Sequence, residues 1–416
     1  MQALPNKASD NPEQNPNQYR FVIGGLVLLC HLALGMNLFS ASPVLPLIID
    51  EYAISRSAAG LMVTLALFFA AVFGLPGGVI ISRIGAQRAF TIGYWLMALI
   101  ALSPLAPNFI SLLALRLAFG VGTAFLLTAT GPLMMQWFKP REILVMNAFN
   151  TAALSLGIAL SVSTAAPLAN WLGWSMALGI FGLAGVAGAF TWTLLARPVV
   201  KASSLASTPV TALTRKEIWS VISHPAVLLL VAADGGVLLQ YTALTSWLPT
   251  FFNEVRDMSL SRGGFITGIL PFVGVFAVLA GGILPSRFGL KPIFFVAPGI
   301  LIVVAGPGTF LSGNLIVIYA SIAVLGIGSW LYVPTLLSLP MALPGMTPEK
   351  VGIVWGFIIT VSGFCMFLSP LLVGAVRDIW GSFTPGFIVC GVAAWTLLLA
   401  GILMPRALNP TPAPGR

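Results

Sequence analysis

Three ionisable side chains lie inside long apolar runs of the sequence: His31, Arg116 and Asp234. An imidazole or a carboxyl group can take up and release a proton, whereas a guanidinium keeps its charge and binds carboxylates. A charge in the middle of a bilayer is costly, at roughly 3 kcal/mol on insertion scales. The types of these residues therefore indicate proton transfer and anion binding, and their settings indicate a function.

Each of the three residues also has a structural interpretation. Arg116 could bind an anion or take part in proton coupling, or it could bond to backbone carbonyls of the first helix and hold helices together. Asp234 is interpreted as a proton carrier, and the alternative is a solvated carboxylate near the cytoplasmic mouth. His31 is the second candidate for proton coupling, and its alternative is a satisfied packing residue.

Uncharged polar and aromatic side chains extend these positions into a candidate site. Asp234, Tyr241 and Thr245 share one helical face, because their spacing matches the repeat of an α-helix, and this stripe is expected to face a central cavity. The expected substrate-binding residues are Arg116, His31, Asn37, Tyr241, Thr245, Asn147, Asn150, Trp330 and Tyr332. Hydrogen bonding between helices is the alternative for Asn147 and Asn150, and contact with lipid is the alternative for Trp330 and Tyr332.

The composition of the chain identifies the surroundings of these residues. Hydrophobic residues make up 58% of the 416 residues, charged residues make up 7%, and the mean hydropathy is +0.99. Soluble domains carry about 25% charged residues. The sequence therefore predicts an all-α integral membrane protein whose solvent is mostly lipid. The three cysteines show no metal-ligand spacing, and neither a metal nor another cofactor is expected.

Breaks in the apolar pattern at charges, prolines and glycines predict twelve membrane-spanning helices. They lie near residues 21–45, 58–81, 89–106, 109–136, 142–169, 174–195, 225–252, 263–284, 292–311, 314–341, 351–376 and 383–404. The chain accordingly divides into a disordered cytoplasmic tail (1–20), a six-helix bundle (21–195), a cytoplasmic linker (196–224), a second six-helix bundle (225–404) and a cytoplasmic tail (405–416).

The distribution of lysine and arginine sets the expected orientation. With both termini in the cytoplasm, the 20 basic residues lie on the cytoplasmic side, apart from Arg116 in a span and the outer residues Arg56, Arg256, Arg262 and Arg377. This excess is the positive-inside pattern of membrane proteins. It accounts for most of the net charge of +9, and because the basic residues form no contiguous stripe, nucleic-acid binding is not expected.

A short phrase occurs twice, as GVIISRIG at residues 78–85 and as GILPSRFG at residues 282–289. Both copies follow the second helix of their half, and GVG at 120–122 similarly matches GIG at 326–328 in the fourth helix. The two halves are therefore expected to be structural copies with the same orientation. Such parallel repeats are typical of transporters that rock one half against the other around a central site.

With these motifs the chain resembles the major facilitator superfamily. The family signature after the second helix is Gly-x-x-x-Asp-Arg-x-Gly followed by basic residues, and an Arg before Gly-x-Gly in the fourth helix matches RLAFGVG at Arg116. The resemblance covers about residues 21–404 and implies that the repeated phrase acts in gating. The gating residues so implied are Gly78, Ser82, Arg83, Gly85, Arg88, Gly282, Ser286, Arg287 and Gly289. Ser82 and Ser286 replace the usual aspartate, so they cannot supply the charge that helps lock the family's cytoplasmic gate.

Some segments, such as YTALTSWLPTFFNE at 241–254, look similar to the cyanate/nitroimidazole and anion-symporter branches of that family. The resulting expectation is a monomeric secondary active transporter in the cytoplasmic (inner) membrane. It would move a small organic anion or polar metabolite by alternating access, coupled to protons. The alternative is efflux of many toxic compounds by proton antiport. An enzyme is not expected, because the sequence has neither a Gly-rich phosphate loop ending in Gly-Lys-Ser/Thr nor a catalytic constellation.

Overall fold

The computed structural model describes residues 16–138, 140–197, 215–289, 291–343, 345–346 and 348–408. Within these ranges every regular element is an α-helix or a 3-10 helix, which confirms the all-α prediction. The N-terminal half contains α1 (Pro16–Leu38), η2 (Ser42–Val44), α2 (Leu45–Tyr52), α3 (Arg56–Ile84), α4 (Ala86–Ala98), η3 (Leu99–Leu105), α5 (Phe109–Trp137), α6 (Pro140–Leu172) and α7 (Trp174–Leu195).

The C-terminal half begins with a short helix inside the segment that the sequence predicted as a linker. Its elements are α8 (Arg215–Ile222), α9 (Pro225–Arg256), α10 (Leu260–Phe288), α11 (Ile293–Gly308), α12 (Leu315–Leu331), α13 (Val333–Ala342), α14 (Pro348–Trp380), α15 (Thr384–Ala394) and α16 (Thr396–Leu408). The long helices α9, α10 and α14 form the part of this half that is most relevant to the candidate site.

Eleven helical stretches of the described residues are long and apolar enough to cross a membrane, and the twelfth predicted span corresponds to a shorter helix. This helix, α11, has 16 residues and replaces the predicted span 292–311. At 1.5 Å per residue it is about 24 Å long, against about 30 Å for the hydrocarbon core of a bilayer. Several other spans are interrupted, notably between α1 and η2 and between α12 and α13.

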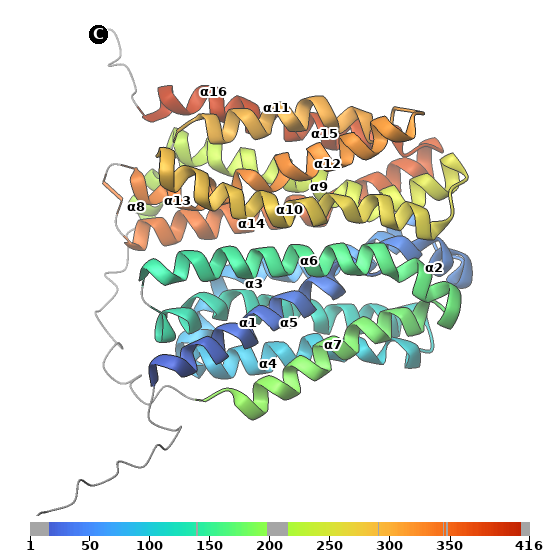
Figure 1. Cartoon of the computed structure of the whole chain (residues 1–416), viewed down its shortest axis with the longest axis horizontal. Helices are drawn as coiled ribbons and strands as arrows, with labels where there is room; N and C mark the ends of the chain where they lie inside the picture. Colours follow the sequence, from blue (N-terminus) through green and yellow to red (C-terminus); the bar gives the residue numbers. More distant parts are fainter. Residues whose placement is uncertain are drawn as a thin grey trace, which may run out of the picture.

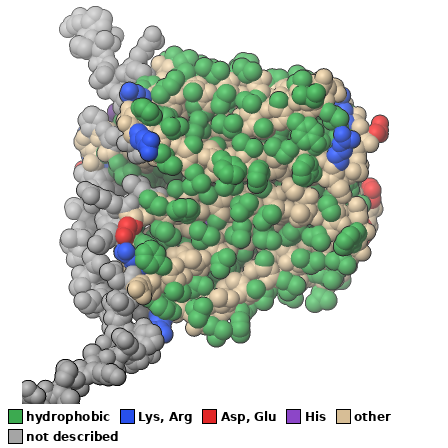
Figure 2. Space-filling view, in the orientation of Figure 1, with side chains coloured by type: hydrophobic (Ala, Val, Ile, Leu, Met, Phe, Trp, Pro, Cys, Tyr) green, Lys and Arg blue, Asp and Glu red, His purple; other side chains and the backbone are tan. Residues whose placement is uncertain are grey.

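The helices form two bundles that lie side by side (Figure 1). Elements α1–α7 make one bundle and α9–α16 the other, and they meet where α6 packs on α10 and α3 packs on α14. Figure 2 shows hydrophobic side chains across the face between the two ends of the molecule, while charged side chains lie at those ends. An apolar belt with charged ends is the surface that a protein surrounded by lipid requires.

The repeated phrase ends in the same sharp turn in both bundles. Gly85 has a φ of +87° between α3 and α4, and Gly289 has a φ of +79° after α10. Residues with a Cβ atom rarely adopt such positive φ values. Each copy of the phrase therefore needs glycine at its last position, and the common turn supports the interpretation of the halves as copies.

A cluster of charged side chains joins the two bundles at the end where α2 lies. The Glu254 carboxylate pairs with Arg56 of α3 over 2.9 Å and with Arg377 of α14 over 3.0 Å. The Asp378 carboxylate accepts hydrogen bonds from the backbone N–H groups of Arg56 and Ser57, over 3.2 Å and 3.0 Å. These N–H groups are the first, unpaired donors of α3, so one bundle caps a helix of the other. The five residues are referred to as the Glu254 cluster.

Candidate functional site

Arg116 lies on α5 and is completely buried. Its guanidinium donates to the carbonyl oxygen of Asn37 over 2.7 Å and to the hydroxyl of Ser40 over 3.2 Å. Because α1 ends at Leu38, the Asn37 carbonyl is among the last four of that helix, which have no partner within it. The helix dipole also favours a cation at this end. These contacts favour the structural interpretation of Arg116, in which it holds α1 and α5 together.

The end of α1 inside a predicted span is explained by the sequence FSASPVLP at residues 39–46. Its two prolines have no N–H to donate, and the residue before a proline is restricted away from the helical conformation. Asn37 stabilises the same break, because its side-chain amide donates to the carbonyls of Ala33 over 2.8 Å and Phe181 over 2.9 Å. Asn37 thus connects α1 to α7, a helix-to-helix contact.

Asp234 lies on α9 with 7% of its surface exposed, which does not fit a solvated carboxylate. One carboxylate oxygen accepts a hydrogen bond from the Tyr332 hydroxyl over 2.8 Å, and the other accepts one from the Ser362 hydroxyl over 2.5 Å. Hydroxyl groups can donate or accept. They can therefore remain bonded to the carboxyl group in both of its charge states, which suits a group that takes up and releases a proton.

The two partners of Asp234 differ from the sequence-based expectation. Tyr332 was expected to bind substrate or face lipid, but it is fully buried and its hydroxyl is bonded to Asp234. Ser362 was not identified at all. Its only signal in the sequence is a hydroxyl in the apolar run of residues 351–376, and a lone serine in such a run is usually a packing residue. Together, these contacts join α9, α14 and the junction of α12 with α13.

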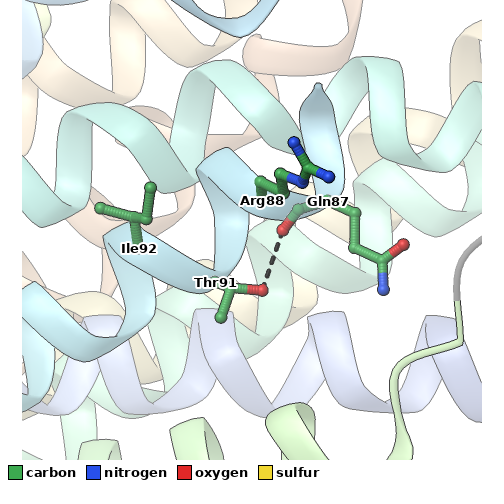
Figure 3. A pocket seen from close by; sticks show the side chains of 4 residues that line it. All are labelled: Gln87, Arg88, Thr91 and Ile92. Carbon is green, nitrogen blue, oxygen red and sulfur yellow. Dashed lines mark hydrogen bonds between the residues drawn. The ribbon is translucent and has the colours of Figure 1, made fainter. Parts of the chain in front are cut away.

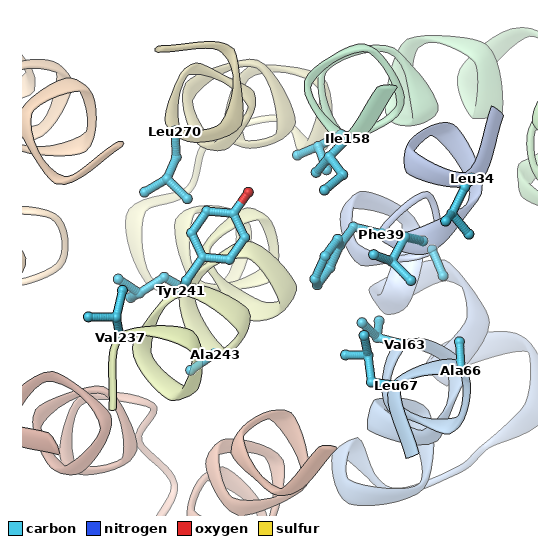
Figure 4. Packing of buried hydrophobic residues seen from close by; sticks show 14 of the residues in the cluster. Leu34, Phe39, Val63, Ala66, Leu67, Ile158, Val237, Tyr241, Ala243 and Leu270 are labelled. Carbon is cyan, nitrogen blue, oxygen red and sulfur yellow. The ribbon is translucent and has the colours of Figure 1, made fainter. Parts of the chain in front are cut away.

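Tyr241 lies in an aromatic group at the boundary of the two bundles. Its ring meets Phe39 with centroids 6.4 Å apart and Trp330 of α12 with centroids 5.5 Å apart. Figure 4 shows Tyr241 and Phe39 facing one another from opposite bundles. The Tyr241 hydroxyl lies close to the polar groups of Thr245 and Trp330, but among the described residues none of these three buried groups makes a hydrogen bond of good geometry. An unpaired buried polar group costs about 1–3 kcal/mol, so these atoms indicate a place for a bound polar molecule or water.

The remaining expected site residues, His31, Asn147 and Asn150, differ in whether their polar atoms have hydrogen-bond partners. His31 is buried, and its Nδ1 donates to the Val27 carbonyl oxygen of the same helix over 2.9 Å, which favours the packing interpretation. Asn150 on α6 is also buried, but neither polar atom of its amide has a partner in the described part of the chain. Asn147 is half-buried. Asn150 therefore resembles Tyr241 and Thr245 in having free hydrogen-bonding capacity.

The expected gating residues lie far from these clusters along their helices. Arg83 and Arg287 are exposed near the ends of α3 and α10, and the same two helices carry Gly78, Ser82, Gly282 and Ser286 in their last turns. Arg88 lines a pocket of about 490 Å³ together with Gln87, Thr91 and Ile92 on α4 (Figure 3). This pocket contains none of the expected substrate-binding residues. No group of three His, Cys, Asp or Glu side chains that could hold a metal occurs in the ranges described.

The two charged residues lie in different bundles and are connected through aromatic side chains. Arg116 holds Asn37 and Ser40, which flank Phe39. Phe39 contacts Tyr241, and Tyr241 contacts Trp330, two positions before the Tyr332 that binds Asp234. Free hydrogen-bonding groups are thus found between a buried cation in one bundle and a buried carboxyl group in the other.

Several known proteins of similar sequence are transporters. The sequence profile of the Major Facilitator Superfamily matches residues 27–370. The hexuronate transporter of Bacillus subtilis (strain 168) is 22% identical over 88% of this chain and 90% of its own length. The cyanate transport protein CynX of Escherichia coli (strain K12) is 23% identical, over 91% and 98%. The probable L-galactonate transporter of the same E. coli strain is 23% identical, over 86% and 83%.

A solved structure has the same arrangement of helices. It is a bacterial homologue of the human lysosomal transporter Spinster in an inward-facing, unoccupied conformation. The TM-score is 0.68 at 16% sequence identity, and the match covers 94% of this chain and 95% of that one. At this level of identity the similarity establishes the fold alone.

Proposed function

The chain belongs to the major facilitator superfamily, and from this membership we propose that it moves a small organic anion across the cytoplasmic membrane, coupled to protons. The two bundles rock around a site between them, so that the cargo is exposed to one side of the membrane at a time. The cargo binds where Phe39 and Tyr241 meet in this conformation, after rocking of the bundles has separated the two rings, and the polar groups of Thr245, Trp330 and Asn150 are available to it.

The observation that carries the choice of an anion is the buried positive charge of Arg116, which holds α1 and α5 together without being paired with a carboxylate among the described residues. Arg20, Arg56 and Arg377 form ion pairs with glutamates, whereas Arg116 is paired with no carboxylate in the described part of the chain. The guanidinium instead binds the backbone and hydroxyl groups on both sides of Phe39. In surroundings that exclude water, such a charge attracts an anion more strongly than it would in water.

The similar proteins give independent support. Hexuronate, cyanate and L-galactonate, the compounds in the names of three relatives, are all small anions. Identities of 22–23% do not transfer one of these cargoes to this chain, but they support the same class of cargo.

Asp234 is proposed as the proton carrier. Its carboxyl group is buried and held by two hydroxyls, whereas the ring of His31 is bonded to a carbonyl of its own helix. A proton on Asp234 would remove the negative charge that lies on the far side of the aromatic group from Arg116. An anion could then enter without repulsion, and cargo and proton would cross together.

We also propose the orientation of the chain in the membrane. Both termini and the repeated phrase, with Arg83 and Arg287, face the cytoplasm, and the Glu254 cluster closes the outer end. The bundles correspond to residues 21–195 and 225–404, and each chain works as a monomer. The phrase residues act as the cytoplasmic gate.

Uptake into proteoliposomes tests this function. Purified protein should accumulate labelled glucuronate, galactonate or cyanate when the outside is acidic, and a protonophore should abolish the accumulation. Asp234→Asn is the matched variant: it should still exchange the anion across the membrane but should no longer accumulate it in a pH gradient. Failure with all three anions, combined with proton-driven expulsion of a lipophilic cationic dye, would instead identify an exporter.

A further inference from the structure

The helical span that contains α12 and α13 is interrupted between the two helices. The two helices are separated by Tyr332 alone, which ends α12 and starts α13. Pro334 has no N–H and its ring crowds the carbonyl four residues earlier, so one backbone hydrogen bond is missing at the place where α12 ends and α13 begins. α10 approaches the junction so closely at Gly281 that a Cβ atom there would lie 2.2 Å from the Leu331 carbonyl oxygen. The junction is therefore fixed on one side and interrupted along its own axis.

Two side chains of this junction point to the two parts of the candidate site. Trp330 meets Tyr241 in the aromatic group, where its N–H has no partner among the described residues. Tyr332 donates its hydroxyl hydrogen to Asp234. A single bend in one span thus contacts both the proposed cargo site and the proposed proton carrier.

From this geometry we propose that Tyr332 is a positioning residue that transmits the charge of Asp234 to the angle between α12 and α13. The inference rests on the proposed proton coupling. While Asp234 is a carboxylate, the hydroxyl of Tyr332 makes a charge-assisted hydrogen bond, which is about twice as strong as a bond between neutral groups. Protonation of Asp234 leaves one neutral acceptor oxygen and one O–H donor, so the hydrogen bond from Tyr332 becomes weaker. α13 is then free to change its angle at the cytoplasmic end.

The groups around Asp234 leave Tyr332 as the residue that can transmit a change in the charge of Asp234 to the junction of α12 and α13. The titratable groups that face Asp234 are the Tyr332 hydroxyl and the thiol of Cys365 on α14. Ser362, the other partner of Asp234, lies within the continuous helix α14, so its hydrogen bond cannot alter the angle between α12 and α13. Thr396 of α16 donates to the carbonyls of Ala232 and Ala393 and does not titrate. Of the two hydroxyls that hold the carboxylate, only that of Tyr332 belongs to an interrupted segment.

A distance measurement between spin labels tests the inference without any cargo. Leu228 near the start of α9 and Met341 near the end of α13 are both exposed and are replaced by cysteine. Cys30, Cys365 and Cys390 are replaced by alanine, in a background that is retained only if its Tm stays close to that of the wild type. We expect the distance distribution to shift between pH 8 and pH 5.5, and we expect Tyr332→Phe to lose this shift. Ser362→Ala, the matched loss of one hydroxyl, should keep it.

Three results would overturn the inference: no shift in the parent protein, an unchanged shift in Tyr332→Phe, or an equal loss in Ser362→Ala. The last would mean that the position of the carboxylate matters and not its bond to the junction. The outcome is separable from the proposed function, because the labels report on α13 whether or not any anion is transported. Uptake assays on the same variants should show that Tyr332→Phe still moves the anion but with a flattened pH dependence.

Discussion

Arg116 and Asp234 are both buried charges in the middle of a predicted span, but the groups that hold them differ. Arg116 binds a backbone carbonyl and one hydroxyl at the end of α1. Asp234 binds two side-chain hydroxyls, from α14 and from the junction of α12 with α13. A backbone carbonyl can only accept, so it requires a permanent donor, whereas a hydroxyl can reverse its role.

The difference separates a fixed charge from a switchable one. A guanidinium does not lose its proton in proteins, and it binds the Asn37 carbonyl together with the Ser40 hydroxyl, which donates to the same oxygen over 3.1 Å. A carboxyl group can be neutral or charged while both hydroxyls remain in contact. We therefore expect changes at Arg116 to affect folding first, and changes at Asp234 to affect the pH dependence of transport first.

The strongest effect is expected from Arg116→Ala. The substitution removes two hydrogen bonds of a charged donor and leaves the Asn37 carbonyl with the Ser40 hydroxyl as its donor, and a hydrogen bond to a charged group contributes about 1.5–3 kcal/mol. The free energy of unfolding should therefore fall by a few kcal/mol, seen as a lower Tm of the purified protein. Arg116→Lys, which keeps one donor and the charge, should recover part of the loss.

Arg83→Ala is the control for this change, because Arg83 is exposed at the end of α3. Its Tm should remain close to that of the wild type. If Arg116→Ala melted like the wild type and lost only anion uptake, Arg116 would act on the cargo directly. The contrast with Asp234 would then disappear.

A smaller effect on stability, but a large one on coupling, is expected from Asp234→Asn. The amide can still accept from one hydroxyl and donate to the other, so the contacts with Tyr332 and Ser362 are kept without the charge. The Tm should stay near the wild-type value, while the rate of uptake should no longer rise as the outside is acidified. A measurement of uptake from pH 5.5 to pH 8 checks this, and a normal pH profile would remove Asp234 as the carrier.

Most of the helices could be predicted because lipid leaves the backbone no alternative to internal hydrogen bonds. The apolar run at 263–284 is thus found within α10, and that at 225–252 within α9. The interruptions could not be predicted from prolines alone. Pro249 and Pro271 lie inside continuous helices, whereas Pro334 follows a break. What distinguishes these positions is whether neighbouring helices supply partners for the freed backbone groups, which depends on tertiary contacts.

The candidate site was predictable to a similar extent. Asp234 and Tyr241 of the polar stripe contact Tyr332 and Trp330, two residues apart on α12 and its junction. That the stripe, with Thr245, faces a central cavity stays a prediction. The periodicity of one helix gives the direction of a side chain but not its partner in another helix. For that reason Ser362 was missed, and for the same reason the sequence left the two interpretations of Arg116 open.

The Glu254 cluster sharpens the comparison, because its charges contact each other across the two bundles. Partly exposed ion pairs contribute about 0–1 kcal/mol, so Glu254→Gln should change the Tm less than Arg116→Ala does. It should instead weaken closure at this end, because Arg56 of one bundle and Arg377 of the other lose their shared carboxylate. Labelling of a cysteine at Ser42, which is buried in η2 against α9, by an impermeant thiol reagent should become faster, as it should without the Glu254 change when salt screens the pairs. Glu51→Gln, a change of carboxylate outside the cluster, should leave labelling unchanged. Equal labelling in Glu254→Gln and in the wild type would mean that apolar packing between α3 and α14, and not charge, keeps this end closed.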